Sequence, residues 1–183
     1  MMRPHVWLAA AALFVVLACS QQGATPPVKQ GVSMADSAEQ VMLGVRMLLT
    51  DRGVQRAELF ADTGYVFEDQ TRFELRKVRA TFNTSTGTKD GVLSADRGTY
   101  NQREQRLEGY GHVVIVTTEG KRLSSPHMKY MQAANEVSSD SAFTLVEPGR
   151  SLNGIGFRAD PQLTRVQVLR AGTGRGSLTL PAQ

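Results

Sequence analysis

Two stretches of eight residues, thirty positions apart, share a Leu-Ser start and a Tyr end. The first copy is LSADRGTY, Leu93–Tyr100, and the second is LSSPHMKY, Leu123–Tyr130. The match continues beyond the tyrosines, because Gln102 corresponds to Gln132. A period near thirty residues is typical of stacked supersecondary units, so the repeat predicts a fold built from repeated strand pairs. The alternative is two similar strand pairs within an ordinary β-sandwich.

The chain around the repeat has the composition of antiparallel β-structure. Gly, Thr, Ser and Asn recur between short runs rich in Val, Leu, Phe and Tyr. The segment 41–49 also fits a helical stripe, but the TDRG turn directly after it favours a strand. The expected strands are 41–49, 55–61, 65–68, 72–83, 92–100, 106–117, 122–130, 136–139, 143–146, 152–160 and 163–170.

The apolar alternation changes phase inside several of these strands. Leu123 and Met128 have opposite parity, so an unbroken strand would place them on opposite faces. A bulge at Pro126 would return both to one face. A similar change of phase falls at Lys77. Strands that change phase bend, so the sequence predicts a strongly curved sheet.

The N-terminal segment has the features of an export signal. Arg3 precedes an apolar run, Val6–Ala18, which is shorter than the roughly 20 residues that span a bilayer. Residues 1–18 are therefore predicted to be a signal peptide. Cys19 is the only cysteine and directly follows a small residue, which resembles a bacterial lipoprotein cleavage site and predicts a lipid anchor. An accidental thiol in the leader is the alternative, and 19–35 is expected to hold the lipidated cysteine and a flexible linker.

Charge and motifs argue against several classes of function. The net charge of +4 favours anionic partners, but the basic residues are scattered singly and do not alternate with aromatic ones, so nucleic acid is not expected. His112 and His127 lack metal-ligand spacing. Neither a nucleophile elbow nor a phosphate-binding Gly loop is present. The sequence therefore predicts no enzyme, no metal site and no cofactor.

The segment from Leu93 to Asp140 resembles the OstA-like repeat of lipopolysaccharide-transport proteins. That repeat has an Ala and a Tyr, then Leu-x-Gly-x-Gly-x-Val-x-Ile, a Gly turn, a second apolar strand ending in Tyr, and a closing Val-x-x-Asp. The matching positions here are Ala95, Tyr100, Leu107, Gly109, Gly111, Val113, Ile115, Gly120, Leu123, Met128, Tyr130, Val137 and Asp140. Flanking matches begin at Gly53 and Gly149 and follow the order of the LptC-type periplasmic component.

The resemblance implies an all-β fold, a single curved, incompletely closed antiparallel β-jellyroll over residues 36–170 with a Gly-rich tail at 171–183. It implies a periplasmic carrier that receives lipopolysaccharide from LptF/LptG-like domains of an inner-membrane ABC exporter and passes it to an LptA-like bridge protein. Well-known LptC members carry a transmembrane helix, whereas this chain carries a predicted lipid.

The location of the anchor and the class of function have alternatives. The family role requires anchoring at the inner membrane, although Ser20 after Cys19 favours the outer membrane under the enterobacterial sorting rule. The alternative function is that of a lipid-anchored structural or adaptor β-protein with a closed core, which binds only protein.

Alternating apolar side chains are the candidates for a lipid-binding lining, because each methylene removed from water contributes about 0.8 kcal/mol. Filling a dry core is the alternative for each of them. The half-polar strand at 163–170 is expected to be an edge that contacts a partner through Leu163, Val166 and Val168. The predicted lining consists of Phe73, Leu75, Val113, Ile115, Leu123, Met128, Tyr130, Phe143 and Leu145.

Overall fold

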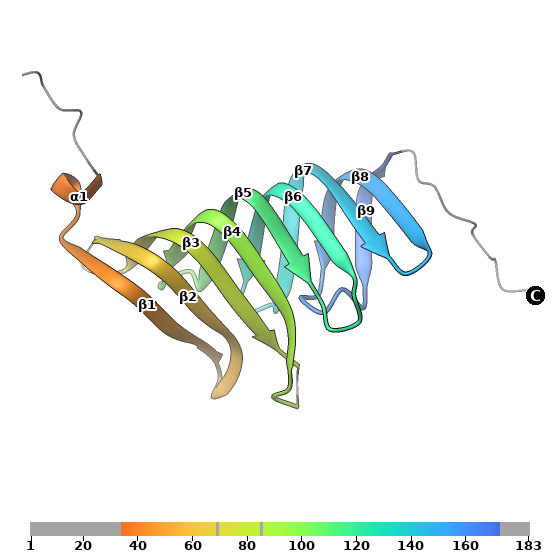
Figure 1. Cartoon of the computed structure of the whole chain (residues 1–183). Helices are drawn as coiled ribbons and strands as arrows, with labels where there is room; N and C mark the ends of the chain where they lie inside the picture. Colours follow the sequence, from red (N-terminus) through yellow and green to blue (C-terminus); the bar gives the residue numbers. More distant parts are fainter. Residues whose placement is uncertain (1–33, 69, 85, 173–183) are drawn as a thin grey trace, which may run out of the picture. The chain divides into compact units, whose positions relative to one another are not determined.

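The computed structural model describes residues 34–172 apart from 69 and 85. In this part of the chain a short helix, α1, precedes nine strands that form one antiparallel sheet in chain order (Figure 1). This confirms the expected all-β, antiparallel fold. The elements are α1 Met34–Ser37, β1 Gln40–Asp51, β2 Val54–Phe67, β3 Arg72–Asn83, β4 Lys89–Asn101, β5 Arg106–Val116, β6 Arg122–Met131, β7 Glu136–Glu147, β8 Arg150–Ala159 and β9 Val166–Ala171.

Several strand boundaries differ from the expectation. The segments 55–61 and 65–68 are one strand, β2, and 136–139 and 143–146 are one strand, β7. A short break in alternation is here a bend within a strand rather than a turn between two. The ambiguous segment 41–49 lies in β1, as expected.

The last strand, β9, begins later than the expected residue 163, because Asp160 organises a loop in front of it. The main-chain oxygen of Asp160 accepts a hydrogen bond from the Leu163 N–H (2.9 Å). Its carboxylate accepts bonds from the N–H groups of Thr164 (3.2 Å) and Arg165 (2.6 Å). These amides are therefore occupied within the loop, and regular pairing with β8 starts at Val166.

Bends near the middle of the strands line up across the sheet, and we call this row the bend line. Lys77 has a left-handed φ of 49°, and the inward-facing residues on both sides of it, Leu75 and Val78, are buried. The pairing of β6 with β7 is interrupted around Pro126. Both predicted changes of phase are therefore confirmed. The bend line consists of Gly44, Asp62, Lys77, Asp96, Gly111, His112, Pro126, Asp140 and Gly156.

The bend line divides the sheet into two layers that face each other, which confirms the predicted curvature. Phe82 and Tyr130 meet across the gap, with ring centroids 4.8 Å apart. The edge strands β1 and β9 each pair with one neighbour, so the sheet is not closed into a barrel. Layer A contains 40–43, 63–67, 72–76, 97–101, 106–110, 127–131, 136–139, 157–159 and 166–168; layer B contains 45–51, 54–61, 78–83, 89–95, 113–116, 122–125, 142–147 and 150–155.

Inward-facing glycines allow the layers to approach each other beside the bend line. A Cβ atom at Gly98 would lie 2.9 Å from Val78 Cγ2 and 2.8 Å from a main-chain oxygen. A Cβ atom at Gly64 would lie 2.8 Å from Val45 Cγ2. All three distances are shorter than van der Waals contact, so these positions require the absence of a side chain.

Two buried serines compensate for the interrupted pairing of β6 with β7. The Ser125 hydroxyl donates to the main-chain oxygen of Ala142 (3.0 Å). The Ser139 hydroxyl donates to the main-chain oxygen of His127 (2.6 Å). These bonds satisfy carbonyl groups that the regular ladder leaves unpaired where β6 and β7 bend.

Candidate functional site

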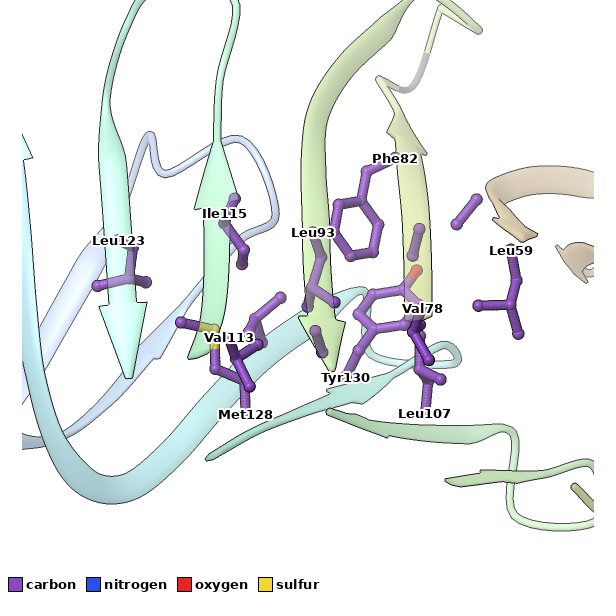
Figure 2. Close-up of a cluster of buried hydrophobic side chains, with 14 of the residues drawn as sticks. Leu59, Val78, Phe82, Leu93, Leu107, Val113, Ile115, Leu123, Met128 and Tyr130 are labelled. Carbon is purple, nitrogen blue, oxygen red and sulfur yellow. The ribbon is translucent and has the colours of Figure 1, made fainter. Parts of the chain in front are cut away.

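The two layers enclose an apolar interior, which is the candidate site. Figure 2 shows labelled side chains of both layers pointing toward one another, including Leu93 and Ile115 from layer B and Leu107 and Tyr130 from layer A. Of the nine predicted lining residues, Phe73 is half-buried and the other eight are buried. The fold thus brings all nine to one interior, with the phase changes placing residues of opposite parity on the same side.

The interior also contains side chains that the predicted lining omitted. Leu59 and Leu93 alternate with outward residues in β2 and β4, and Leu93 is the repeat counterpart of Leu123, so the sequence held the signal for both. The contribution of β1 was less visible, because its residues fit both helical and strand periods. The main omitted residues are Val45, Leu49, Ala57, Leu59, Phe82, Leu93, Leu107, Val137 and Phe157.

The side chains in the middle of the interior are more deeply buried than those at its two ends. In the middle, Val113, Ile115 and Leu123 are fully buried. The apolar side chains that pack against this core but stay partly exposed come from the outermost strands. They are Met42, Met47 and Phe73 on the β1–β3 side and Leu152, Val166 and Val168 on the β8–β9 side. The apolar surface therefore continues from one edge of the sheet to the other.

Opposite the bend line, the far ends of the layers meet along what we call the mouth. Gln132, at the end of β6, is 2% exposed and its Nε2 donates to the main-chain oxygen of Thr50 on β1 (2.6 Å). The Tyr100 hydroxyl donates to the Oε1 of the same glutamine (3.4 Å). Beside them the Arg56 guanidinium lies 3.5 Å from the buried Asp51 carboxylate. One side chain thus bridges the two layers here.

The loop before β9 closes another part of the mouth, which corrects the prediction for Leu163. This residue was expected on an exposed edge, but it is 1% exposed and points into the interior from a loop with a φ of 54°. Its main-chain oxygen accepts a hydrogen bond from Lys121 Nζ (3.2 Å). The adjacent Gln162 donates through Nε2 to the main-chain oxygen of Asn83 (3.3 Å). Val166 and Val168 do lie on the edge strand, with their side chains against the interior.

The tyrosines at the mouth are held in their neutral form. Burial raises the pKa of Tyr130 and of Tyr100 above the ordinary value of a phenol. The Tyr130 hydroxyl donates to Asn135 Oδ1 (3.0 Å). Both rings therefore present apolar faces inward and a neutral hydrogen-bonding group at the rim of the interior.

Some of the predicted features lie outside the described residues. These are the signal peptide at 1–18, Cys19, most of the linker and the tail beyond Gly172. Among residues 34–172 apart from 69 and 85, His, Cys, Asp and Glu do not gather in groups of three suited to a metal ion. In the same part of the chain, no helix has the length and hydropathy of a membrane span.

A folded-over antiparallel sheet with an apolar interior and two free edges defines the class of incompletely closed β-jellyrolls. A profile of the family described as "Lipopolysaccharide-assembly, LptC-related" matches residues 6–175, and the chain belongs to this family. The protein is thus a periplasmic component of lipopolysaccharide transport. Both the fold and the family expected from the repeat are confirmed.

Comparison with solved structures supports the fold. The chain is similar to LptH from Pseudomonas aeruginosa, described as the LptA homologous periplasmic component of the conserved lipopolysaccharide transport device. The TM-score is 0.51 at 16% sequence identity, over 70% of this chain and 92% of LptH. Comparison with curated protein sequences returned no match.

Proposed function

We propose that the protein carries lipopolysaccharide with its acyl chains in the interior and moves it from one edge of the sheet to the other. The observation that carries this proposal is the continuity of the apolar surface, from Met42 and Phe73 at one end to Leu152 and Val168 at the other. Burial of acyl chains needs no directional contacts, because the hydrophobic effect scales with the area removed from water. A lipid can therefore slide along such a surface while remaining shielded.

Loading requires the layers to separate, because the side chains in the middle of the interior already touch one another. The contacts that join the layers at the mouth are few, and they involve side chains such as Gln132, Lys121 and Gln162. Enclosing about ten methylenes contributes about 8 kcal/mol, which offsets the loss of several such contacts. The lipid thus enters by widening the mouth while the bend line stays intact.

The two free edges serve as docking sites for other jelly rolls. The edge strands β1 and β9 each leave one row of main-chain groups without a strand partner in the described sheet. Such edges recruit partners by main-chain pairing. In this proposal β1 faces the periplasmic domains of an LptF/LptG-like inner-membrane ABC exporter and β9 faces an LptA-like bridge protein. The lipid then passes from the exporter toward the outer membrane.

The proposal includes a lipid anchor at Cys19 that holds the protein at the inner membrane. A Cys19→Ala variant is expected to remain as unprocessed precursor and to lose labelling by a fatty-acid probe. The control is Ser20→Ala, which keeps the thiol. Continued labelling of the Cys19→Ala variant would show that the anchor is not at this residue.

Site-specific photo-crosslinking in cells tests the interior. A crosslinker at Ile115, which is buried between the layers, is expected to capture lipopolysaccharide. The control is the adjacent Val116, which is exposed on the outer face of β5. Equal capture at both positions would contradict the assignment of the inner face. Capture of protein but of no lipid at Ile115, Leu123 and Phe73 would instead support an adaptor with a closed core.

A further inference from the structure

The outer face of layer A exposes large apolar side chains next to the N-terminal edge. Leu43 on β1 is 81% exposed, the highest value among the exposed large hydrophobic residues of the described chain. Val41 on the same strand and Met34 on α1 are also exposed. Exposed apolar groups that gather in one area mark an interaction surface more often than isolated ones do.

Two arginines in the same row of the sheet lie directly opposite each other. The register places Leu43 opposite Thr63, Thr63 opposite Arg76, and Arg76 opposite Arg97, so the apolar and cationic side chains share one row. Like charges directly opposite across strands destabilise a sheet. An anion bound between them would relieve this repulsion.

The nearby carboxylate of Glu74 is engaged by Arg72 and Thr99 rather than by Arg76 or Arg97. Two other arginines of this face are paired with glutamates: Arg72 lies 2.7 Å from Glu74, and Arg106 lies 2.7 Å from Glu108. Arg76 and Arg97 line a hollow of about 270 Å³ together with Met34, Thr99 and Glu74. The Arg76 guanidinium lies 3.6 Å from the Met34 sulfur.

Edge docking of another jelly roll does not account for this surface. Main-chain pairing at β1 extends the sheet sideways. The side chains of Leu43 and Val41 still project outward from the outer face of the sheet. A partner strand thus leaves their outward surface uncovered, and it brings no anion to Arg97, which is three strands further into the sheet. Edge docking therefore leaves this face free to bind a separate ligand.

We propose that Met34, Val41, Leu43, Arg76 and Arg97 form a membrane-contact face that lies on an anionic lipid bilayer. The apolar side chains would enter the boundary between headgroups and acyl chains, and the two guanidinium groups would bind lipid phosphates. Charge complementarity favours this occupant, because anionic lipid surfaces attract basic groups placed beside apolar ones. This role goes beyond the carriage of lipopolysaccharide, since it concerns the outside of the jelly roll.

The position of the face along the chain agrees with this occupant. The face begins at Met34. The apolar run and Cys19 come shortly before it in the sequence, and both are predicted to direct the chain to a membrane. The intervening residues 20–33 reach at most about 50 Å when fully extended. A protein attached to the bilayer through Cys19 can therefore bring this face to the lipid surface.

The test attaches a fluorophore to the mature full-length protein, which is then bound to lipid vesicles. The fluorescence reports whether the labelled position contacts lipid. Leu43→Cys carries the probe, and Leu48→Cys is the matched control, because Leu48 is 59% exposed on the same strand but lies in layer B. Any signal from Cys19 is measured on the unsubstituted chain and subtracted. Both substitutions are at exposed positions, and thermal melting verifies that the fold is kept.

The probe at position 43 is expected to be quenched by nitroxide-labelled lipids in vesicles of phosphatidylcholine and phosphatidylglycerol, and the probe at position 48 is not. Arg76→Gln with Arg97→Gln should weaken this quenching, by about fivefold per arginine in the membrane-bound fraction. Equal quenching at both positions, or quenching unaffected by the arginines and by anionic lipid, would overturn the proposal. If the probe at position 43 is shielded from solvent in native membranes but not in lipid vesicles, the face binds a protein instead of lipid. Lipid capture at Ile115 reports on the carrier function separately.

Discussion

The bend line and the mouth join the same two layers by different physical means. At the bend line the connection is the backbone of the strands themselves, and inward glycines such as Gly98 let the layers touch. At the mouth the connection consists of side chains, with Gln132 reaching Thr50 and Leu163 filling the interior from a loop. A sheet built this way can open along one side and remain folded along the other.

The energies on the two sides differ accordingly. A hydrogen bond such as that of Gln132 contributes about 1 kcal/mol, and a buried leucine contributes about 2 kcal/mol. Breaking these two mouth contacts therefore costs a few kcal/mol, which an enclosed acyl chain can offset. Disrupting the bend line instead requires deforming close-packed backbone, which removes the fold itself.

The largest effect is expected from Gly98→Val, which tests whether the bend line depends on close approach. The added side chain would meet Val78 and a main-chain oxygen, so the free energy of unfolding should fall by about 3 kcal/mol. Denaturant unfolding measures this change. Ser94→Val, at an exposed position on the same strand, should change stability by less than about 0.5 kcal/mol. Similar midpoints for both variants would show that the layers are not tightly packed at Gly98.

The next effect is expected from Leu163→Ala at the mouth. Removing this buried side chain should lower the free energy of unfolding by about 2 kcal/mol and speed the exchange of bound lipid. Unfolding and the rate of transfer of a fluorescent lipopolysaccharide measure the two results. Leu169→Ala on the outer face is the control, because Leu169 is exposed. Lost stability with an unchanged exchange rate would mean that the loop does not limit access to the interior.

Gln132→Ala should have a smaller effect, of about 1 kcal/mol, because it removes one bridge between the layers. Lipid capture at Ile115 should rise in this variant as the mouth loosens. The control is Gln102→Ala, since Gln102 holds the same place in the first repeat copy but is exposed. If both glutamine variants behave alike, the bridge to Thr50 contributes nothing to closure.

The smallest effect is expected from Lys77, a non-glycine residue of the bend line with a left-handed φ of 49°. Glycine adopts this conformation without strain, so Lys77→Gly should be more stable than Lys77→Ala by about 0.5 kcal/mol. Both variants lose the exposed ion pair with Asp62, which therefore cancels in the comparison. A more stable alanine variant would indicate that the bend does not impose this backbone conformation in solution.

The sequence by itself determined the antiparallel β-class, the positions of most strands and the changes of phase at Lys77 and Pro126. Leu123 and Met128 lie on the same side because Pro126 interrupts the ladder between them, and both facts follow from local pattern. Such information is available in sequence because a strand alternates its side chains with a period of two and a bulge shifts that period by one.

Only the tertiary structure decided which far ends of the two layers meet. Gln102 and Gln132 match in sequence, yet only Gln132 is buried, because it lies opposite Thr50, 82 positions away. Leu163 was assigned to an edge by its alternation, but the loop organised by Asp160 turns it into the interior. These contacts depend on how the bend line places one layer over the other. Local residue patterns do not predict which residues of the two layers then come into contact.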